Sequence, residues 1–122
     1  MNEKCLYFIY GTLLRGCSNY HRFGFSKEAR FVRAAVLHGA RMYDLGGYPC
    51  IVLSGSSEDS VHGELYELPI GKCQNSITAM ELGAGCTEKC VVLERVRAVS
   101  FVYETAPAHA PRIVDGVWRE TL

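Results

Sequence analysis

The sequence lacks an excess of charge of either sign, and it lacks any long apolar run. Its 13 lysines and arginines balance its 13 aspartates and glutamates, so no basic surplus indicates nucleic-acid binding and no polybasic block indicates a membrane surface. No apolar stretch approaches the roughly 20 residues of a membrane span. The apolar stretch near the N-terminus ends at Gly11 and is too short for a signal peptide. We therefore expect a cytoplasmic protein without nucleic-acid or membrane partners.

The sequence also lacks a zinc-binding motif, although it contains six cysteines and four histidines. It has no C-x2-C pair, and no histidine stands at the usual ligand spacing from a cysteine. The even cysteine count permits disulfides, but there is no export signal, and 122 residues can bury a core without such links. We expect no metal and six reduced thiols, several of them small apolar core residues: Cys5, Cys17, Cys50, Cys73, Cys86 and Cys90.

What the sequence does contain is many short segments of strand character and one helical segment. The helix is expected over 71–82, where Cys73, Ile77 and Met80 follow helical spacing and Leu-Gly-Ala-Gly ends it. A further short helix is expected near 18–22. Strands are expected over 5–10, 31–38, 40–44, 50–54 and 61–68, with a long β-rich stretch over 91–103. This pattern predicts a single α+β domain spanning 1–122, with a small mixed, curled β-sheet or barrel of short strands and one main helix.

The first strand is followed by Tyr10-Gly11-Thr12-Leu13. Glycine at such a place permits a bulge, a tight turn, or a close approach of a ligand to backbone N–H groups. The tetrapeptide alone favours a bulge at the end of the strand with no ligand, so its meaning depends on the rest of the sequence.

Five segments in order over nearly the whole chain resemble segments of the γ-glutamyl cyclotransferase-like superfamily. This superfamily includes the γ-glutamylamine cyclotransferases and the plant AIG2-like proteins. The segments are YGTLLRGCSNYH, ARMYDLGGYPCIV, VHGELYELP, AVSFVYE and IVDGVWRE. Because all five occur in the same order, a chance resemblance is not expected, and the resemblance implies the fold of that superfamily.

The resemblance implies cleavage of a γ-glutamyl amide by attack of its own α-amine on the γ-carbonyl, which gives 5-oxoproline and a free amine. The nucleophile is tethered to the electrophile, so no cofactor or covalent intermediate is needed. One carboxylate can move the protons, and backbone N–H groups can stabilise the oxyanion. The implied partner is a small γ-glutamyl amine or peptide substrate, bound by a monomer or weak homodimer.

The same resemblance assigns site residues. The superfamily places its catalytic Glu near the end of a helix, and Glu81 in ITAMELGAG occupies that position, although Thr78 replaces the usual Asp and the Tyr-x-Arg segment that usually follows is missing. The backbone amides of the YGTL segment are implied to face the glutamyl group. The implied substrate-binding residues are Tyr10, Gly11, Thr12, Leu13, Tyr48, Pro49 and Tyr103.

Other interpretations remain open at this level. Glu64 competes with Glu81 but lies on an expected strand, where a solvent-facing or paired side chain is favoured; Asp44 is expected to form a turn and Trp118 to anchor the C-terminal segment in the core. The weakened motif around Glu81 also permits a non-catalytic domain that binds a small ligand. A thiol enzyme that uses a Cys–His pair is disfavoured, because no such pair has a recognisable local signature.

Overall fold

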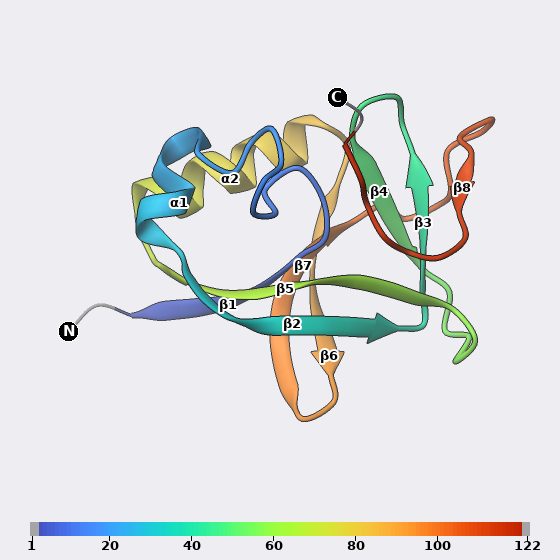
Figure 1. Cartoon of the computed structure of the whole chain (residues 1–122), viewed down its shortest axis with the longest axis horizontal. Coiled ribbons are helices and arrows are strands. Elements are labelled where there is room, and N and C mark those ends of the chain that lie inside the picture. The colour runs from blue at the N-terminus through green and yellow to red at the C-terminus, as the bar shows by residue number, and fades with distance from the viewer. Residues whose placement is uncertain (1–2, 121–122) are drawn as a thin grey trace.

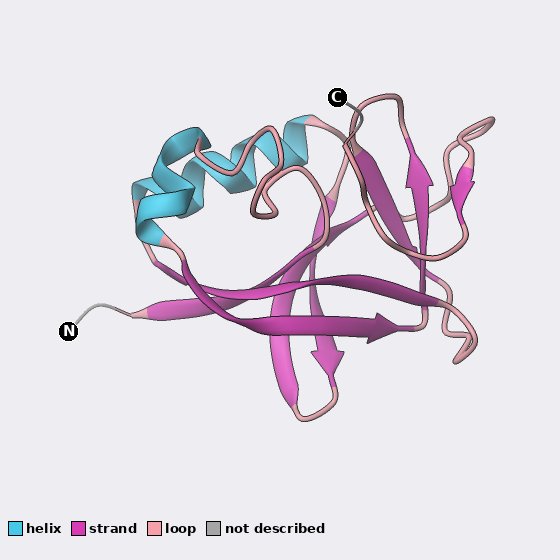
Figure 2. Cartoon of the chain, viewed as in Figure 1, coloured by secondary structure: helices cyan, strands magenta, loops and turns pink. Residues whose placement is uncertain are grey.

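A computed structural model describes residues 3–120, and these residues form two β-sheets with helices packed at one end (Figures 1 and 2). The elements are β1 (Lys4–Ile9), η1 (Arg22–Gly24), α1 (Phe25–Glu28), β2 (Arg30–His38), β3 (Ala40–Asp44), β4 (Pro49–Leu53), β5 (Ser60–Pro69), α2 (Lys72–Gly83), β6 (Thr87–Leu93), β7 (Val96–Val102) and β8 (Arg112–Ile113). One sheet has the order β2-β5-β1-β7-β6 and the other β4-β3-β8. The α+β prediction is confirmed.

Strand β1 lies at the centre of the larger sheet. It pairs antiparallel with β5 from Lys4 opposite Pro69 to Ile9 opposite Glu64, and parallel with β7 at Tyr7. Successive side chains of a strand point to opposite faces. Phe8 therefore joins one hydrophobic cluster, while its neighbours Tyr7 and Ile9 join a second cluster on the helical side of the sheet.

Helix α2 covers the helical side of this sheet. Cys73 and Ile77 lie one helical turn apart, and both are buried in the cluster that contains Tyr7. The start of the helix is tied to β1, because the Gln74 amide donates to the Tyr7 hydroxyl at 2.9 Å and accepts from the Gly71 N–H at 3.3 Å. Within residues 3–120, no helix has the length and apolar character needed to cross a bilayer.

One local prediction is wrong, and a second omits a turn. The short helix expected near 18–22 is instead the η1 turn followed by the four-residue α1, because Asn19 and Arg22 belong to a series of turns closed by local backbone hydrogen bonds. The β-rich stretch expected over 91–103 is a hairpin, β6 and β7, whose turn places Glu94 at φ 55°. No glycine or proline marks that turn in the sequence.

The curled sheets do not close into a barrel. The strands form two separate hydrogen-bonded sheets. An isolated parallel bridge between Val52 and Tyr103 connects the two sheets. The C-terminal segment contributes only the two-residue β8 and then continues without regular structure through Trp118, which is 9% exposed and packs in the cluster around Phe8. Trp118 thus anchors this segment as expected.

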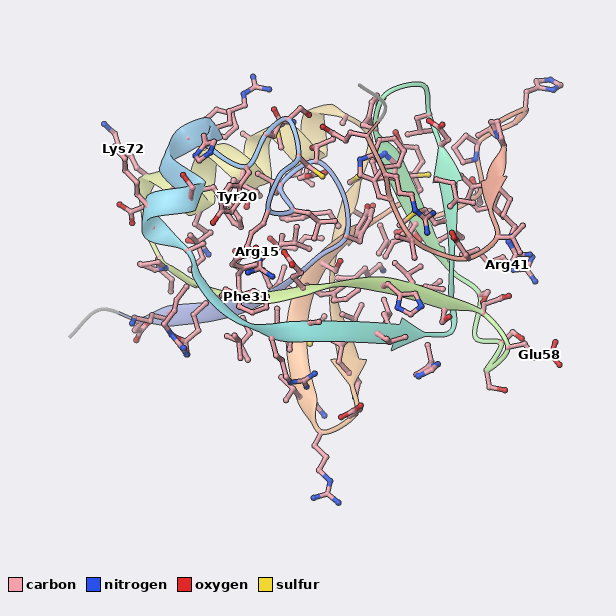
Figure 3. All side chains as sticks on the ribbon, viewed as in Figure 1. Arg15, Tyr20, Phe31, Arg41, Glu58 and Lys72 are labelled. Atoms are coloured by element: carbon pink, nitrogen blue, oxygen red, sulfur yellow. The ribbon has the colours of Figure 1, made fainter. Side chains whose placement is uncertain are left out.

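A buried carboxylate fixes the end of the molecule opposite the helices. Asp59 is 7% exposed and accepts hydrogen bonds from Arg41 at 2.7 Å, Ser54 at 2.7 Å and Arg112 at 2.9 Å. Figure 3 shows Arg41 far from the helical end, where Lys72 is labelled. The contacts hold the segment before β5 against β3 and β8, and they lower the pKa of Asp59 to about 2, with the Arg41 hydrogen bond as the largest cause.

This lowered pKa predicts an acid-sensitive contribution to stability. Because the folded-state pKa lies below the unfolded value, the contribution is present above about pH 4 and is lost as the pH falls toward 2. Asp59→Asn should lower the urea midpoint at pH 7 and reduce its further decline between pH 4 and pH 2, measured by circular dichroism. The matched control is Asp115→Asn, whose exposed carboxylate pairs with Arg119, and an equal loss in both variants would contradict the role of Asp59.

Candidate active site

A cavity of about 390 Å³ lies where β1 ends, between the start of β4 and the last turn of α2. Three stretches that are distant in the sequence form much of its wall. Seven of the eight site residues predicted from the sequence line it: Tyr10, Gly11, Thr12, Leu13, Tyr48, Pro49 and Glu81. The fold therefore brings most of the predicted residues together.

The side chains of the Tyr10–Leu13 segment are engaged by the protein itself. The Tyr10 hydroxyl donates to the carbonyl of Phe101 at 2.7 Å, and burial raises the pKa of Tyr10 well above its usual range. Leu13 is buried in the core, and the Thr12 hydroxyl accepts from the Asn19 amide at 2.9 Å. These contacts hold the segment in one conformation.

The backbone of this segment is left with unused donors. The carbonyls of Gly11 and Thr12 accept from Leu14 at 2.9 Å and Asn19 at 2.8 Å, but the N–H groups of Gly11, Thr12 and Leu13 have no acceptor among residues 3–120. Three consecutive N–H groups without a protein partner can hold an anion or a developing oxyanion.

The structure gives a packing reason for glycine at position 11. A Cβ at Gly11 would lie 2.8 Å from Cγ and 3.1 Å from Cδ of Pro49. Glycine therefore permits the Pro49 ring to pack directly on the segment. The turn before Pro49 is closed by a 2.9 Å bond from the Leu45 N–H to the Tyr48 carbonyl, and Asp44 accepts from the Gly46 N–H at 2.8 Å, as expected for a turn-forming residue.

Glu81 brings a carboxylate from the last turn of α2 to the cavity. Burial raises the pKa of this carboxyl, and the weak S–H hydrogen bond from Cys86, with Sγ 3.6 Å from Oε2, opposes the shift in part. The backbone fixes its position, because the Glu81 carbonyl accepts from the N–H groups of Ala84 at 3.1 Å and Cys86 at 3.0 Å. A desolvated carboxylate of this kind is a stronger base than an exposed one.

Tyr103 is the predicted site residue that the fold does not bring into the cavity wall. Its hydroxyl donates to the carbonyl of Ala84, just beyond α2, and its ring would contact a side chain added at Gly85. In this structure Tyr103 therefore stabilises the end of the helix that carries Glu81.

The other polar candidates lie outside the cavity. Glu64 is paired, as expected: it accepts from Arg15 at 2.9 Å and from the Tyr66 hydroxyl at 2.7 Å. Figure 3 shows Arg15 beside Phe31, and its guanidinium carbon lies 3.9 Å from the centre of that ring. Glu64 is therefore not placed to act on a molecule in the cavity.

The thiols near Glu81 are poorly suited to nucleophilic catalysis. Burial raises the pKa of Cys50 to about 11 and that of Cys86 to about 12, so both thiols stay protonated at neutral pH. Cys50, Cys73 and Cys86 are buried, as expected for small core residues. Within residues 3–120, no three histidine, cysteine or acidic side chains cluster as metal ligands.

Three polar residues that line the cavity were not predicted from the sequence: Ser18, Asn19 and Arg22. Asn19 lies in the segment YGTLLRGCSNYH, which resembles the superfamily. A polar amide in this segment, a few residues after Gly11, could have indicated a site residue. Arg22 gives no such signal in the sequence. In the structure it is followed by left-handed backbone at Phe23 and Gly24, with φ 59° and 78°.

Comparison with known proteins places the chain in a family. The sequence model of the family described as gamma-glutamyl cyclotransferase, AIG2-like, matches residues 7–120, so the chain belongs to this family. A comparison with curated proteins gives no significant match. Family membership supports a cyclotransferase-type enzyme function in general and a small-molecule substrate.

Solved structures share the fold. An AIG2-like protein from Mus musculus is 18% identical, with a TM-score of 0.77, over 96% of this chain and 89% of that one. A uropathogenic E. coli-specific protein is 20% identical, with a TM-score of 0.78, over 96% and 94% of the two chains. An uncharacterised protein from Pyrococcus horikoshii is 23% identical, with a TM-score of 0.74, over 93% and 88%. At these identities the likeness shows the fold alone.

Proposed function

We propose that this protein is a γ-glutamyl cyclotransferase-type enzyme that cleaves a γ-glutamyl amide to 5-oxoproline and a free amine. The observation that carries the proposal is one cavity that contains both a half-buried carboxylate, Glu81, and three backbone N–H groups without a protein acceptor, those of Gly11, Thr12 and Leu13. These are the base and the anion-binding donors that the reaction requires.

In the proposed mechanism, Glu81 accepts a proton from the α-ammonium of the substrate. The freed amine attacks the γ-carbonyl, and a new C–N bond closes the five-membered ring. The backbone N–H groups hold the substrate carboxylate or the developing oxyanion. The amide C–N bond then breaks as Glu81 gives this proton to the leaving nitrogen. The ring nitrogen still carries one excess proton, which Glu81 takes and passes to the free amine, so the amine leaves as an ammonium ion and the carboxylate is regenerated without any other reactant.

The surroundings of Glu81 suit this role. A free α-amino group of a peptide has a pKa near 8, and an ordinary carboxylate with a pKa near 4 is a weak base toward it. Burial of Glu81 raises its pKa and narrows this gap. Hydrogen bonds hold the end of the helix in place: the Tyr103 hydroxyl donates to the Ala84 carbonyl, and the Glu81 carbonyl accepts from two backbone N–H groups. This favours a fixed geometry for the proton transfers.

Release of 5-oxoproline from a panel of γ-glutamyl amides tests the proposal. The panel includes γ-glutamyl amino acids, a γ-glutamyl polyamine and a γ-glutamyl alkylamide, and calorimetry measures binding in parallel. We expect release from at least one amide. Binding without release would favour the non-catalytic ligand-binding domain, for which the replacement of Asp by Thr78 near Glu81 is the supporting observation. The absence of both binding and release would contradict both functions.

A further inference from the structure

Arg22 is the one cationic side chain among the described residues that line the cavity, and Glu81 is the one anionic side chain. Arg22 forms no ion pair with a carboxylate of residues 3–120; its Nη1 lies 3.8 Å from the sulfur of Met80, the residue before Glu81. A guanidinium binds carboxylates through paired N–H donors. The same cavity therefore contains an available carboxylate-binding group and the proposed base.

The local backbone holds this guanidinium in place. Phe23 adopts φ 59° inside η1, a left-handed conformation that is unfavourable for a residue with a side chain, and Gly24 follows at φ 78°. The guanidinium carbon of Arg22 lies 4.7 Å from the centre of the Phe23 ring, which restricts the long side chain. Unfavourable backbone of this kind is concentrated at ligand-binding sites.

The burial of the wall residues indicates which carboxylate Arg22 meets. Gly11 and Leu13, whose N–H groups are the proposed anion-binding donors, are buried, Glu81 is half-buried, and Arg22 is exposed. A glutamyl group bound by those donors lies deep in the cavity, so the leaving amine extends past Glu81 toward the exposed wall. In an amino acid, the α-carboxylate is separated from the amine nitrogen by a single carbon, so it reaches the cation beside the base.

We propose that Arg22 is the specificity-determining residue of this site and binds a carboxylate on the leaving amine, which makes γ-glutamyl amino acids or peptides the substrate class in preference to γ-glutamyl polyamines. This inference rests on the proposed function. The cavity wall also includes Ser18, whose N–H and hydroxyl donate to Glu120 at 2.6 and 3.0 Å, and Trp118 donates to the same carboxylate at 3.3 Å. Glu120 is therefore already bound, and with the backbone N–H groups assigned to the glutamyl group, Arg22 is the side chain available for a second carboxylate.

Two substrates that differ only in charge test the proposal: γ-glutamyl-alanine and γ-glutamyl-alaninamide. We expect the unmodified protein to prefer the acid by about 10-fold or more in kcat/KM, chiefly through KM. Arg22→Ala should remove this preference by raising KM for the acid alone, and Arg22→Lys should retain part of it. Arg33→Ala, which removes a partly exposed arginine of β2 outside the cavity, is the matched control and should behave as the parent.

The outcomes separate the two proposals. If Arg22→Ala impairs the acid and the amide equally while it remains folded by circular dichroism, Arg22 serves the glutamyl group or the fold and the inference is overturned. If Arg22→Ala does not fold, Arg22→Gln is measured instead, and equal impairment of the acid and the amide again overturns the inference. If the parent releases 5-oxoproline from neither compound, the enzyme function fails for this pair, and the preference is measured as the ratio of calorimetric Kd values. A ratio near one, or no binding of either compound, then overturns the inference.

Discussion

Glu81→Gln is expected to retain the fold and substrate binding and to lose turnover by about 10²-fold or more, which is the usual effect of removing a general base. Glutamine keeps the size of the side chain and can still accept the Cys86 hydrogen bond, but it cannot accept the proton of the α-ammonium. Single-turnover release of 5-oxoproline measures the loss, and calorimetry of a γ-glutamyl ligand measures the binding that should persist. A variant that binds normally and turns over within a few-fold of the parent would remove Glu81 from the mechanism.

The matched control is Glu64→Gln. This change also neutralises one carboxylate, but Glu64 lies outside the cavity and is bound by Arg15 and Tyr66. Its turnover should stay within a few-fold of the parent. If the two variants exchange these results, the assignment of Glu81 to the family's catalytic position is wrong.

The pH profile gives a second measurement of the same role. The base must be deprotonated, so kcat/KM of the parent should decline as the pH falls through the raised pKa of Glu81, which lies above the usual range of a glutamate. In Glu81→Gln this decline should be absent from the residual rate. An identical decline in both proteins would assign the titration to another group.

Gly11→Val is expected to abolish measurable ligand binding while much of the sheet still folds. A Cβ at this position would lie 2.8 Å from the Pro49 ring, and valine adds two further methyl groups. Either the Tyr10–Leu13 segment or the turn before β4 must move, and both line the cavity. Calorimetry of a γ-glutamyl ligand measures affinity, and thermal unfolding measures the accompanying loss of stability. Unchanged affinity in a folded variant would remove this segment from the site.

A companion pair of substitutions identifies the cause. Gly11→Ala should weaken binding by the same steric conflict, and the addition of Pro49→Ala should restore part of the loss because it removes the ring that the new Cβ meets. The interaction between the two changes is read from a double-mutant cycle. Additive losses would show instead that the side chain at position 11 acts without Pro49, for example by blocking the approach of the ligand to the backbone.

Much of the site could be predicted because its residues lie in local patterns. The short-range signals are the apolar strand before Tyr10, the glycine after it and the helical spacing that ends near Glu81. The resemblance of five segments in the same order to one superfamily then assigned these separate signals to one site. Arg22 could not be found in this way, because it lies in a series of turns without a motif of its own. The left-handed backbone of the next residue, Phe23, is likewise not indicated by a glycine at that position. The turn at Glu94 was missed for the same reason.

Contacts between distant segments were the other part that could not be predicted. Asp59 lies in a polar stretch that is typical of an exposed connection, and its burial follows only from Arg41 and Arg112, which two other strands supply. Tyr103 was expected at the substrate because of its segment, but its hydroxyl is bound to the end of α2. Short-range patterns contain no information about which distant group a polar side chain meets.

The central place of β1 has a consequence for how the protein folds as it is synthesised. This strand emerges first, yet its two partners in the sheet, β5 and β7, come much later, and the Tyr10 hydroxyl that anchors its end bonds to a residue 91 positions away. Long-range pairings of this kind slow folding, because a large loop must close before its contacts stabilise the chain. The cavity can therefore form only after β7 has left the ribosome, and until β5 emerges the apolar residues of β1 have neither strand partner.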